Sequence, residues 1–259
     1  MAIGTCKLCF KEKDLKKSHA IANSIFKRIL RPANGKAILL SNGDEKIAYT
    51  SDSWAEEQLC GECEGLLSRK YEKYSLEVLR GRRGTIINHP TSDYYQNVQV
   101  KELILFFLSI YWRGAHSSHK SYHALNISFS NNMLLREAIL NNTNVLLSKY
   151  AVRVYKLIDS TGSANDFESK VFKNFIASPY VKNPSVLHSR VTICFAFEGF
   201  YIEIIEGGVK FKERSTIGAL NANEESMRIK HICLFDIPQL VEIMGKSLDK
   251  QRAGHTLIK

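Results

Sequence analysis

The chain has 259 residues and carries 36 lysines and arginines against 26 acidic residues, a formal net charge of +10 with an isoelectric point near 9.3. A hydrophobic fraction of 44% and a charged fraction of 24% exclude a disordered or collagen-like chain. The longest apolar run, Leu103–Trp112, is far shorter than the ~20 residues that a membrane-spanning helix needs. The N-terminus has no apolar signal core, so we expect a cytoplasmic protein that does not contact a membrane.

The pattern of residues 1–84 predicts a small first domain. A short strand is expected over Leu15–Ile21 and a short helix over Asn23–Leu30. A longer helix is expected to begin at Gly61 and to run toward Leu79, because apolar side chains recur there at helical spacing. Glycines and a proline between residues 81 and 90 end this helix, and they set the start of a second domain, residues 85–259.

The second domain is predicted to begin with helices. The apolar run Val100–Arg113 is expected to be its central core helix, and Met133–Leu140 a further helical segment. From about residue 150 the period changes to that of strands. We therefore predict an α+β fold, in which the second domain mixes helices with an antiparallel sheet.

The C-terminal pattern predicts a hairpin, a strand and a helix. Residues 191–197 and 200–205 are apolar runs separated by Glu198-Gly199, the signature of a β-hairpin. A strand is expected over 228–235. A terminal helix should follow, with Asp236 as its N-cap and Pro238 in its first turn.

Four of the six cysteines form two pairs, Cys6-Lys-Leu-Cys9 and Cys60-Gly-Glu-Cys63. In a reducing compartment such pairs are metal ligands or redox centres more often than disulfides. Two pairs without a surrounding β-α-β pattern favour one tetrahedral zinc site, since each tight turn presents two thiolates to the same ion. The alternative is four unrelated structural cysteines. Cys194 and Cys233 lie in apolar strand-like runs, and we expect them to be inert core residues.

Residues 1–90 supply half of the net charge, and their basic residues gather over Lys7–Lys36 and again over Arg69–Arg83. A basic surface beside a small zinc domain is typical of a protein that binds a phosphate backbone, although a solvated face without a partner is the alternative. The residues expected to contact nucleic acid are Lys16, Lys17, Lys27, Arg28, Arg69, Lys70, Arg82 and Arg83.

Three segments, Cys6-Lys-Leu-Cys9, Leu15-Lys-Lys-Ser-His19 and Leu59-Cys-Gly-Glu-Cys-Glu64, resemble the four-cysteine zinc branch of the HNH (ββα-metal) endonucleases. They are most similar to a bacterial group with the motifs C-x-x-C, Ser-His and Leu-Cys-x-x-Cys-Glu, and the helix that follows in that group resembles Phe106–Arg113. The similarity covers residues 5–80 and that helix. It implies an N-terminal zinc-bound ββα (treble-clef/HNH-like) domain, nucleic acid as the partner, DNA in preference to RNA, and a role in bacterial defence or a mobile element.

The resemblance also implies a catalytic site. In that family a histidine at the end of the first strand activates water, and a divalent ion stabilises the charge on phosphate. His19 matches the general base, with a structural role or a further zinc ligand as its alternatives. Glu64 directly follows the second cysteine pair. With Glu72, two turns further along the helix, it could hold Mg²⁺ or Mn²⁺. The alternatives are a supporting or structural role for Glu64, and for Glu72 an ion pair with a lysine or arginine.

Four positions depart from the family pattern. Ser18 stands where an Asp or His usually binds the catalytic ion, and Ala55 stands where the middle Asn is usual. Glu64 stands where His or Asn is usual, and Ser68, one turn after it, stands where a second His is usual. Two functions therefore stay open: a metal-dependent HNH-like endonuclease, or a catalytically inactive zinc-stabilised nucleic-acid-binding module. His19 with Glu64 favours the first, and Ser18 with Ala55 the second. In either case the C-terminal domain is expected to sense a ligand, or to bind a protein partner or a second copy of the chain.

Overall fold

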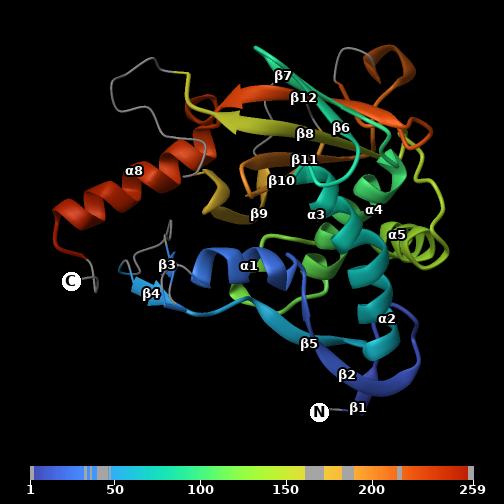
Figure 1. The fold of residues 1–259 in the computed structure, drawn as a ribbon. Helices are drawn as coiled ribbons and strands as arrows, with labels where there is room; N and C mark the ends of the chain where they lie inside the picture. The colour runs from blue at the N-terminus through green and yellow to red at the C-terminus, as the bar shows by residue number, and fades with distance from the viewer. Residues whose placement is uncertain are drawn as a thin grey trace.

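The computed structural model describes residues 3–31, 34–35, 37–39, 46, 48–160, 172–182, 190–214 and 218–255. A seven-stranded sheet forms one layer, helices pack beneath it, and three N-terminal strands lie on the far side of these helices (Figure 1). The predicted mixture of helices and sheet is confirmed. Among the helices of the described residues, none combines the length and the apolar composition that crossing a bilayer requires.

The N-terminal strands form an antiparallel sheet in the order β1-β2-β5. β1 (Ile3–Thr5) and β2 (Glu12–His19) are a hairpin, and β5 (Ala55–Cys60) pairs with the other edge of β2. The predicted strand at 15–21 thus begins three residues earlier and ends at His19. Helix α1 (Asn23–Leu30) has the predicted bounds, and a small hairpin joins β3 (Ala37–Leu39) to β4 (Ala48–Thr50).

One continuous helix begins at the second cysteine pair. It consists of α2 (Gly61–Leu66), the π-helical stretch η2 (Leu67–Glu72) and α3 (Lys73–Leu79). The prediction of a helix from Gly61 toward Leu79 is confirmed, whereas its π-helical widening was not expected from the sequence. Such widenings are rare and occur frequently at functional sites.

Two helices fill the space between the N-terminal strands and the large sheet. α4 (Val100–Ala115) is buried on almost every side, as expected for a predominantly apolar core helix, and it packs against the π-helical stretch, α3, α5 and β11. α5 (Phe129–Asn141) begins four residues before the predicted segment. The Ser128 side chain caps its N-terminus by accepting a hydrogen bond from the Asn131 N–H.

The large sheet has the order β6-β7-β12-β8-β11-β10-β9, and all neighbours are antiparallel except β12 and β8. Its strands are β6 (Thr85–His89), β7 (Ser92–Gln96), β8 (Tyr150–Ile158), β9 (Ile176–Lys182), β10 (Thr192–Phe197), β11 (Phe200–Glu206) and β12 (Ser226–Cys233). The predicted hairpin closes at Glu198-Gly199, where both residues have positive φ, 51° and 82°. β6, β7 and β9 were not predicted.

The two faces of the large sheet are covered by different helices. Phe195 and Phe197 of β10 belong to the core formed with α4, whereas Cys194 and Ala196 belong to a second cluster that includes Leu240 of α8 (Pro238–Arg252). Cys194 and Cys233 are both buried, as predicted. The N-cap prediction for α8 was wrong: Asp236 ends a short 3-10 turn and the cap is the residue after it, so that proline takes the first helical position.

The main hydrophobic core extends across residue 84. One cluster of buried side chains includes Leu8, Ile25 and Tyr71 together with Phe106 and Phe197. The polypeptide passes from the N-terminal elements into the large sheet at this point, since β6 begins at Thr85. The division into domains 1–84 and 85–259 stays a prediction.

Candidate metal centre and adjoining polar cluster

The β2–β5 pairing brings the two cysteine pairs together. The first pair lies in the turn between β1 and β2, which closes because Phe10 has a positive φ of 59° and donates its N–H to the Cys6 carbonyl (2.9 Å). The second pair begins at the end of β5, where Cys60 lies opposite Leu15. Cys63 follows in the first turn of α2.

The four sulfur atoms of Cys6, Cys9, Cys60 and Cys63 all lie within 4.8 Å of one another. The Cys9 and Cys60 sulfurs are 3.9 Å apart. A tetrahedral ion with Zn–S bonds of about 2.3 Å places its sulfurs about 3.8 Å apart, so the cluster fits a metal ion such as zinc. The backbone N–H of Cys60 donates to the Cys6 sulfur (3.3 Å), a hydrogen bond that favours a thiolate.

The thiols show the electrostatics of groups that share one site. Burial alone raises the pKa of Cys6, but backbone N–H groups that include those of Cys9 and Cys60 donate to its sulfur and lower its pKa to about 7. Burial raises the pKa of Cys63, and the charge of Cys6 raises it further. One ionised thiol therefore opposes ionisation of its neighbour, and a bound cation removes this conflict.

Glu64 lies beside the end of β2. The buried Ser18 donates its hydroxyl to Glu64 Oε2 at 2.7 Å. Burial raises the pKa of Glu64, while the Arg113 charge and the Ser18 hydrogen bond oppose the rise. Ser18 therefore fixes the carboxylate at the start of the facing helix α2.

A buried arginine joins the same cluster. Arg113, in the last turn of α4, has a fully buried side chain and forms an ion pair with Glu72 (2.7 Å), which lies at the end of the π-helical stretch. Within the described residues, neither terminal nitrogen of its guanidinium has a well-directed hydrogen-bond acceptor. The positive charge also acts on Glu64 and His19. The carboxylates predicted to hold a divalent ion therefore face a buried cation of the protein itself.

His19 ends β2 and is half-buried. Its Nε2 is hydrogen-bonded to Ser53 Oγ (3.0 Å), and its ring lies 6.3 Å from that of Phe26. Burial, together with the charges of Arg113 and Lys27, lowers the pKa of His19 to about 4. The imidazole is therefore uncharged at neutral pH and can accept a proton.

The structure brings His19, Glu64 and Glu72 into one electrostatic cluster around Arg113, a residue to which sequence reasoning gave no role. The available signal was a single arginine at the end of a long apolar run. Such a charge has to find a partner when the helix is buried. Ser53, the partner of His19, gave no signal because it lies in a polar loop remote in sequence.

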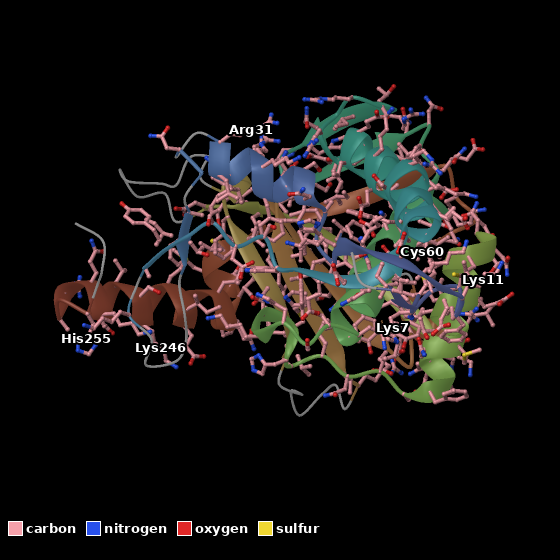
Figure 2. All side chains as sticks on the ribbon, turned by 90° about the horizontal axis from the view of Figure 1, so that it is seen from below. Lys7, Lys11, Arg31, Cys60, Lys246 and His255 are labelled. Carbon is pink, nitrogen blue, oxygen red and sulfur yellow. The ribbon has the colours of Figure 1, made fainter. Side chains whose placement is uncertain are left out.

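Most of the residues predicted to bind nucleic acid are exposed: Lys17, Lys27, Arg69, Lys70, Arg82 and Arg83. Lys16 is half-buried, and Arg28, although largely exposed, forms an ion pair with Glu198 (3.2 Å). Figure 2 shows Lys7 and Lys11 at the end of the molecule that holds Cys60, far from Lys246 of α8. That these residues bind nucleic acid stays a prediction.

Comparison of the chain with protein-family models, with curated proteins and with solved structures gave no significant match.

Proposed function

We propose that this protein is a metal-dependent HNH-like endonuclease, in which the N-terminal strands and the long helix hydrolyse phosphodiesters of nucleic acid, DNA in preference to RNA. The observation that carries the proposal is the electrostatic cluster in which the Arg113 charge acts on both His19 and Glu64, with Glu64 directly following the last of the four cysteines. The order β2, β5 and α2, with the helix beginning at the second cysteine pair, is the order that the HNH resemblance implies. Bacterial defence or a mobile element is the setting that we propose for it.

In this proposal the four cysteines hold a structural Zn²⁺. Such an ion would fix the start of α2 against β2 and so keep Glu64 beside Ser18, the neighbour of His19. His19 takes a proton from the attacking water because its imidazole is uncharged. The positive charge of Arg113 stabilises the negative charge that develops on the phosphate during hydrolysis. A Mg²⁺ or Mn²⁺ ion at Glu64 and Glu72 would add Lewis-acid stabilisation of that charge.

A second candidate function is a zinc-stabilised nucleic-acid-binding module without catalysis. The ion pair between Arg113 and Glu72 favours this alternative, since it engages a carboxylate that the divalent ion needs. The low pKa of His19 favours it as well, because a general base with a pKa of about 4 is weak. Both candidate functions require the zinc site and the basic surface, but only the endonuclease hydrolyses the phosphodiester.

Plasmid nicking separates the two functions. Purified protein is incubated with supercoiled plasmid and Mg²⁺ or Mn²⁺, beside a His19→Ala variant and a His123→Ala control, since His123 is exposed and bonded only to the local Lys120 carbonyl among the described residues. Catalysis predicts nicking by wild type and control but not by His19→Ala, with zinc content and DNA affinity unchanged. Absence of nicking with both ions, together with retained DNA binding, would assign the protein to the second function.

A further inference from the structure

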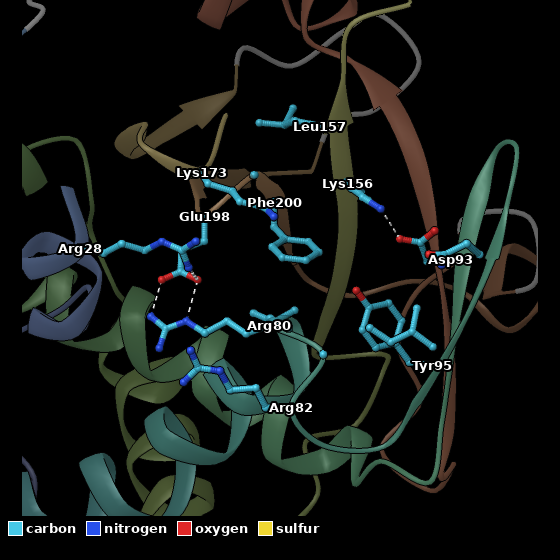
Figure 3. A pocket seen from close by; sticks show the side chains of 15 residues that line it. Arg28, Arg80, Arg82, Asp93, Tyr95, Lys156, Leu157, Lys173, Glu198 and Phe200 are labelled. Carbon is cyan, nitrogen blue, oxygen red and sulfur yellow. Dashed lines mark hydrogen bonds and ion pairs between the residues drawn. The ribbon is translucent and has the colours of Figure 1, made fainter. Parts of the chain in front are cut away.

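A cavity of about 260 Å³ lies where the end of α3, the helix α1 and the large sheet meet. Five basic side chains from segments far apart in the sequence line it, together with the acidic side chains Glu198 and Asp93. The basic residues are Arg28, Arg80, Arg82, Lys156 and Lys173 (Figure 3). The lining therefore carries a surplus of three positive charges. A concave wall of one sign concentrates ligands of the opposite charge.

Both acidic side chains of the cavity are already neutralised. Glu198, only 3% exposed, accepts hydrogen bonds from Arg80 Nε (2.8 Å) and Arg28 (3.2 Å), and from a second nitrogen of Arg80. Asp93, 2% exposed, accepts from Lys156 Nζ (2.6 Å) and is paired with His231 (3.1 Å). These ion pairs hold the wall of the cavity together. A lining cation outside them is available to bind an anionic ligand.

Two cations of the lining stay outside these pairs. Arg82 and Lys173 are exposed, and neither forms an ion pair within the part of the chain that the structure describes. Figure 3 shows the Arg82 side chain close to that of Arg80, and Lys173 close to Glu198. Neighbouring guanidinium groups repel one another unless an anion lies between or beside them. Arg82 and Lys173 therefore lie on opposite sides of the pair formed by Arg80 and Glu198, and each adds an uncompensated positive charge to the cavity (Figure 3).

Apart from Asn88, the remaining side chains of the lining are apolar or aromatic. The Phe200 ring lies between the group around Glu198 and the pair formed by Lys156 and Asp93, and Tyr95 lines the side next to Asp93 (Figure 3). An apolar wall with a few converging polar groups is the usual composition of a small-molecule site. The volume lies just below the roughly 300–1,000 Å³ typical of drug-sized ligands, which indicates a compact ligand.

We propose that this cavity binds a small organic phosphate, a phosphate monoester no larger than a nucleoside monophosphate. Arg82 and Lys173 attract its phosphate group from opposite sides of the cavity, and its uncharged part packs against Phe200. Phosphate fits better than a single carboxylate because it carries more charge and offers three oxygens to guanidinium and ammonium donors. The inference does not depend on the proposed endonuclease activity, since binding at this site needs no catalysis.

Isothermal titration calorimetry of the full chain at low salt tests the proposal. The probes are adenosine 5′-monophosphate, ribose 5-phosphate, inorganic phosphate and adenosine. We expect both monoesters to bind more tightly than inorganic phosphate, and adenosine not to bind. The double variant Arg82→Gln/Lys173→Gln should lose roughly tenfold in affinity for each cation removed, about 1.4 kcal/mol per cation. Lys73→Gln, exposed on α3 and outside the cavity, should leave the affinity unchanged.

The double variant changes only exposed side chains, so its melting temperature should equal that of wild type and report intact folding. Failure of both monoesters to bind wild type would overturn the proposal, and so would equal affinity of wild type and double variant. A short DNA oligonucleotide serves as a third probe. If it binds through Arg82 and Lys173 while the monoesters do not, the cavity belongs to a nucleic-acid surface and the proposal is wrong.

Discussion

Replacing Arg113 by methionine tests whether the buried arginine organises the cluster beside the cysteines. The substitution keeps an unbranched chain of similar volume and removes the charge that compensates Glu72, whose side chain is only 12% exposed. Breaking a buried ion pair by removing one partner costs about 3–5 kcal/mol. The same charge also acts on the buried Glu64, so we expect the loss of stability caused by Arg113→Met to lie toward the upper end of that range.

A double-mutant cycle makes this expectation specific to the ion pair. Glu72→Gln removes the other partner. The destabilisation of the double variant Arg113→Met/Glu72→Gln should be roughly 2 kcal/mol smaller than the sum of the two single destabilisations. Urea denaturation followed by circular dichroism gives the free energy of unfolding of each variant. Arg83→Met provides the control, since Arg83 is half-exposed and its pair with Glu77 should contribute at most about 1 kcal/mol. A loss below about 1 kcal/mol for Arg113→Met, or additive single effects, would refute the reasoning.

Three further predictions concern the metal, pH and salt. Cys60→Ser or a strong chelator should unfold the N-terminal sheet, as measured by zinc analysis and circular dichroism; unchanged melting would rule out the zinc site. Folding lowers the pKa of His19 from 6.5 to about 4, so the unfolded chain binds more protons between these pH values. Stability should therefore fall as pH falls from 6.5 to 4, and His19→Asn should reduce that loss by about 1–2 kcal/mol in denaturation at each pH, less than the full shift implies because solvent screens the partly exposed ring; equal pH slopes would contradict the low pKa. DNA affinity should fall steeply with salt in filter binding, and less steeply after charge reversal at Lys16, Lys17, Arg82 and Arg83, whereas a flat response would exclude backbone binding.

The elements that sequence reasoning located are those whose pattern is local. α1, the long helix and the β10–β11 hairpin were predicted because helical spacing or a Glu-Gly turn is visible within a short window. β7 was missed although it forms a local hairpin with β6, because its sequence, Ser-Asp-Tyr-Tyr-Gln, is mostly polar; its other neighbour, β12, lies far along the chain. β9 contains Pro179, which is tolerated because β9 is the edge strand of the sheet.

The residues of the candidate site likewise divide into those that a local sequence pattern predicts and those that only long-range contacts bring together. Cysteine spacing predicted a four-thiol cluster, since each pair is a local motif. The contacts of Ser18 with Glu64 and of Arg113 with Glu72 join residues about 40 positions or more apart, and no local pattern encodes them. The exposed charges of Arg28 and Arg82 were correctly placed at the surface, but their position around one cavity depends on how α1 and α3 pack on the sheet.

The helix from Gly61 to Leu79 is about 28 Å long at 1.5 Å per residue, and both of its ends are anchored. Cys63 in its first turn belongs to the thiol cluster, and Arg80 just past its last residue holds Glu198. Inserting or deleting one residue between them would turn one end by about 100° relative to the other, so one of the two contacts would be lost. Related chains should therefore keep the residue count between these anchors while substitutions accumulate on the exposed face. That fixed count gives a criterion for finding distant relatives whose residue identities have diverged.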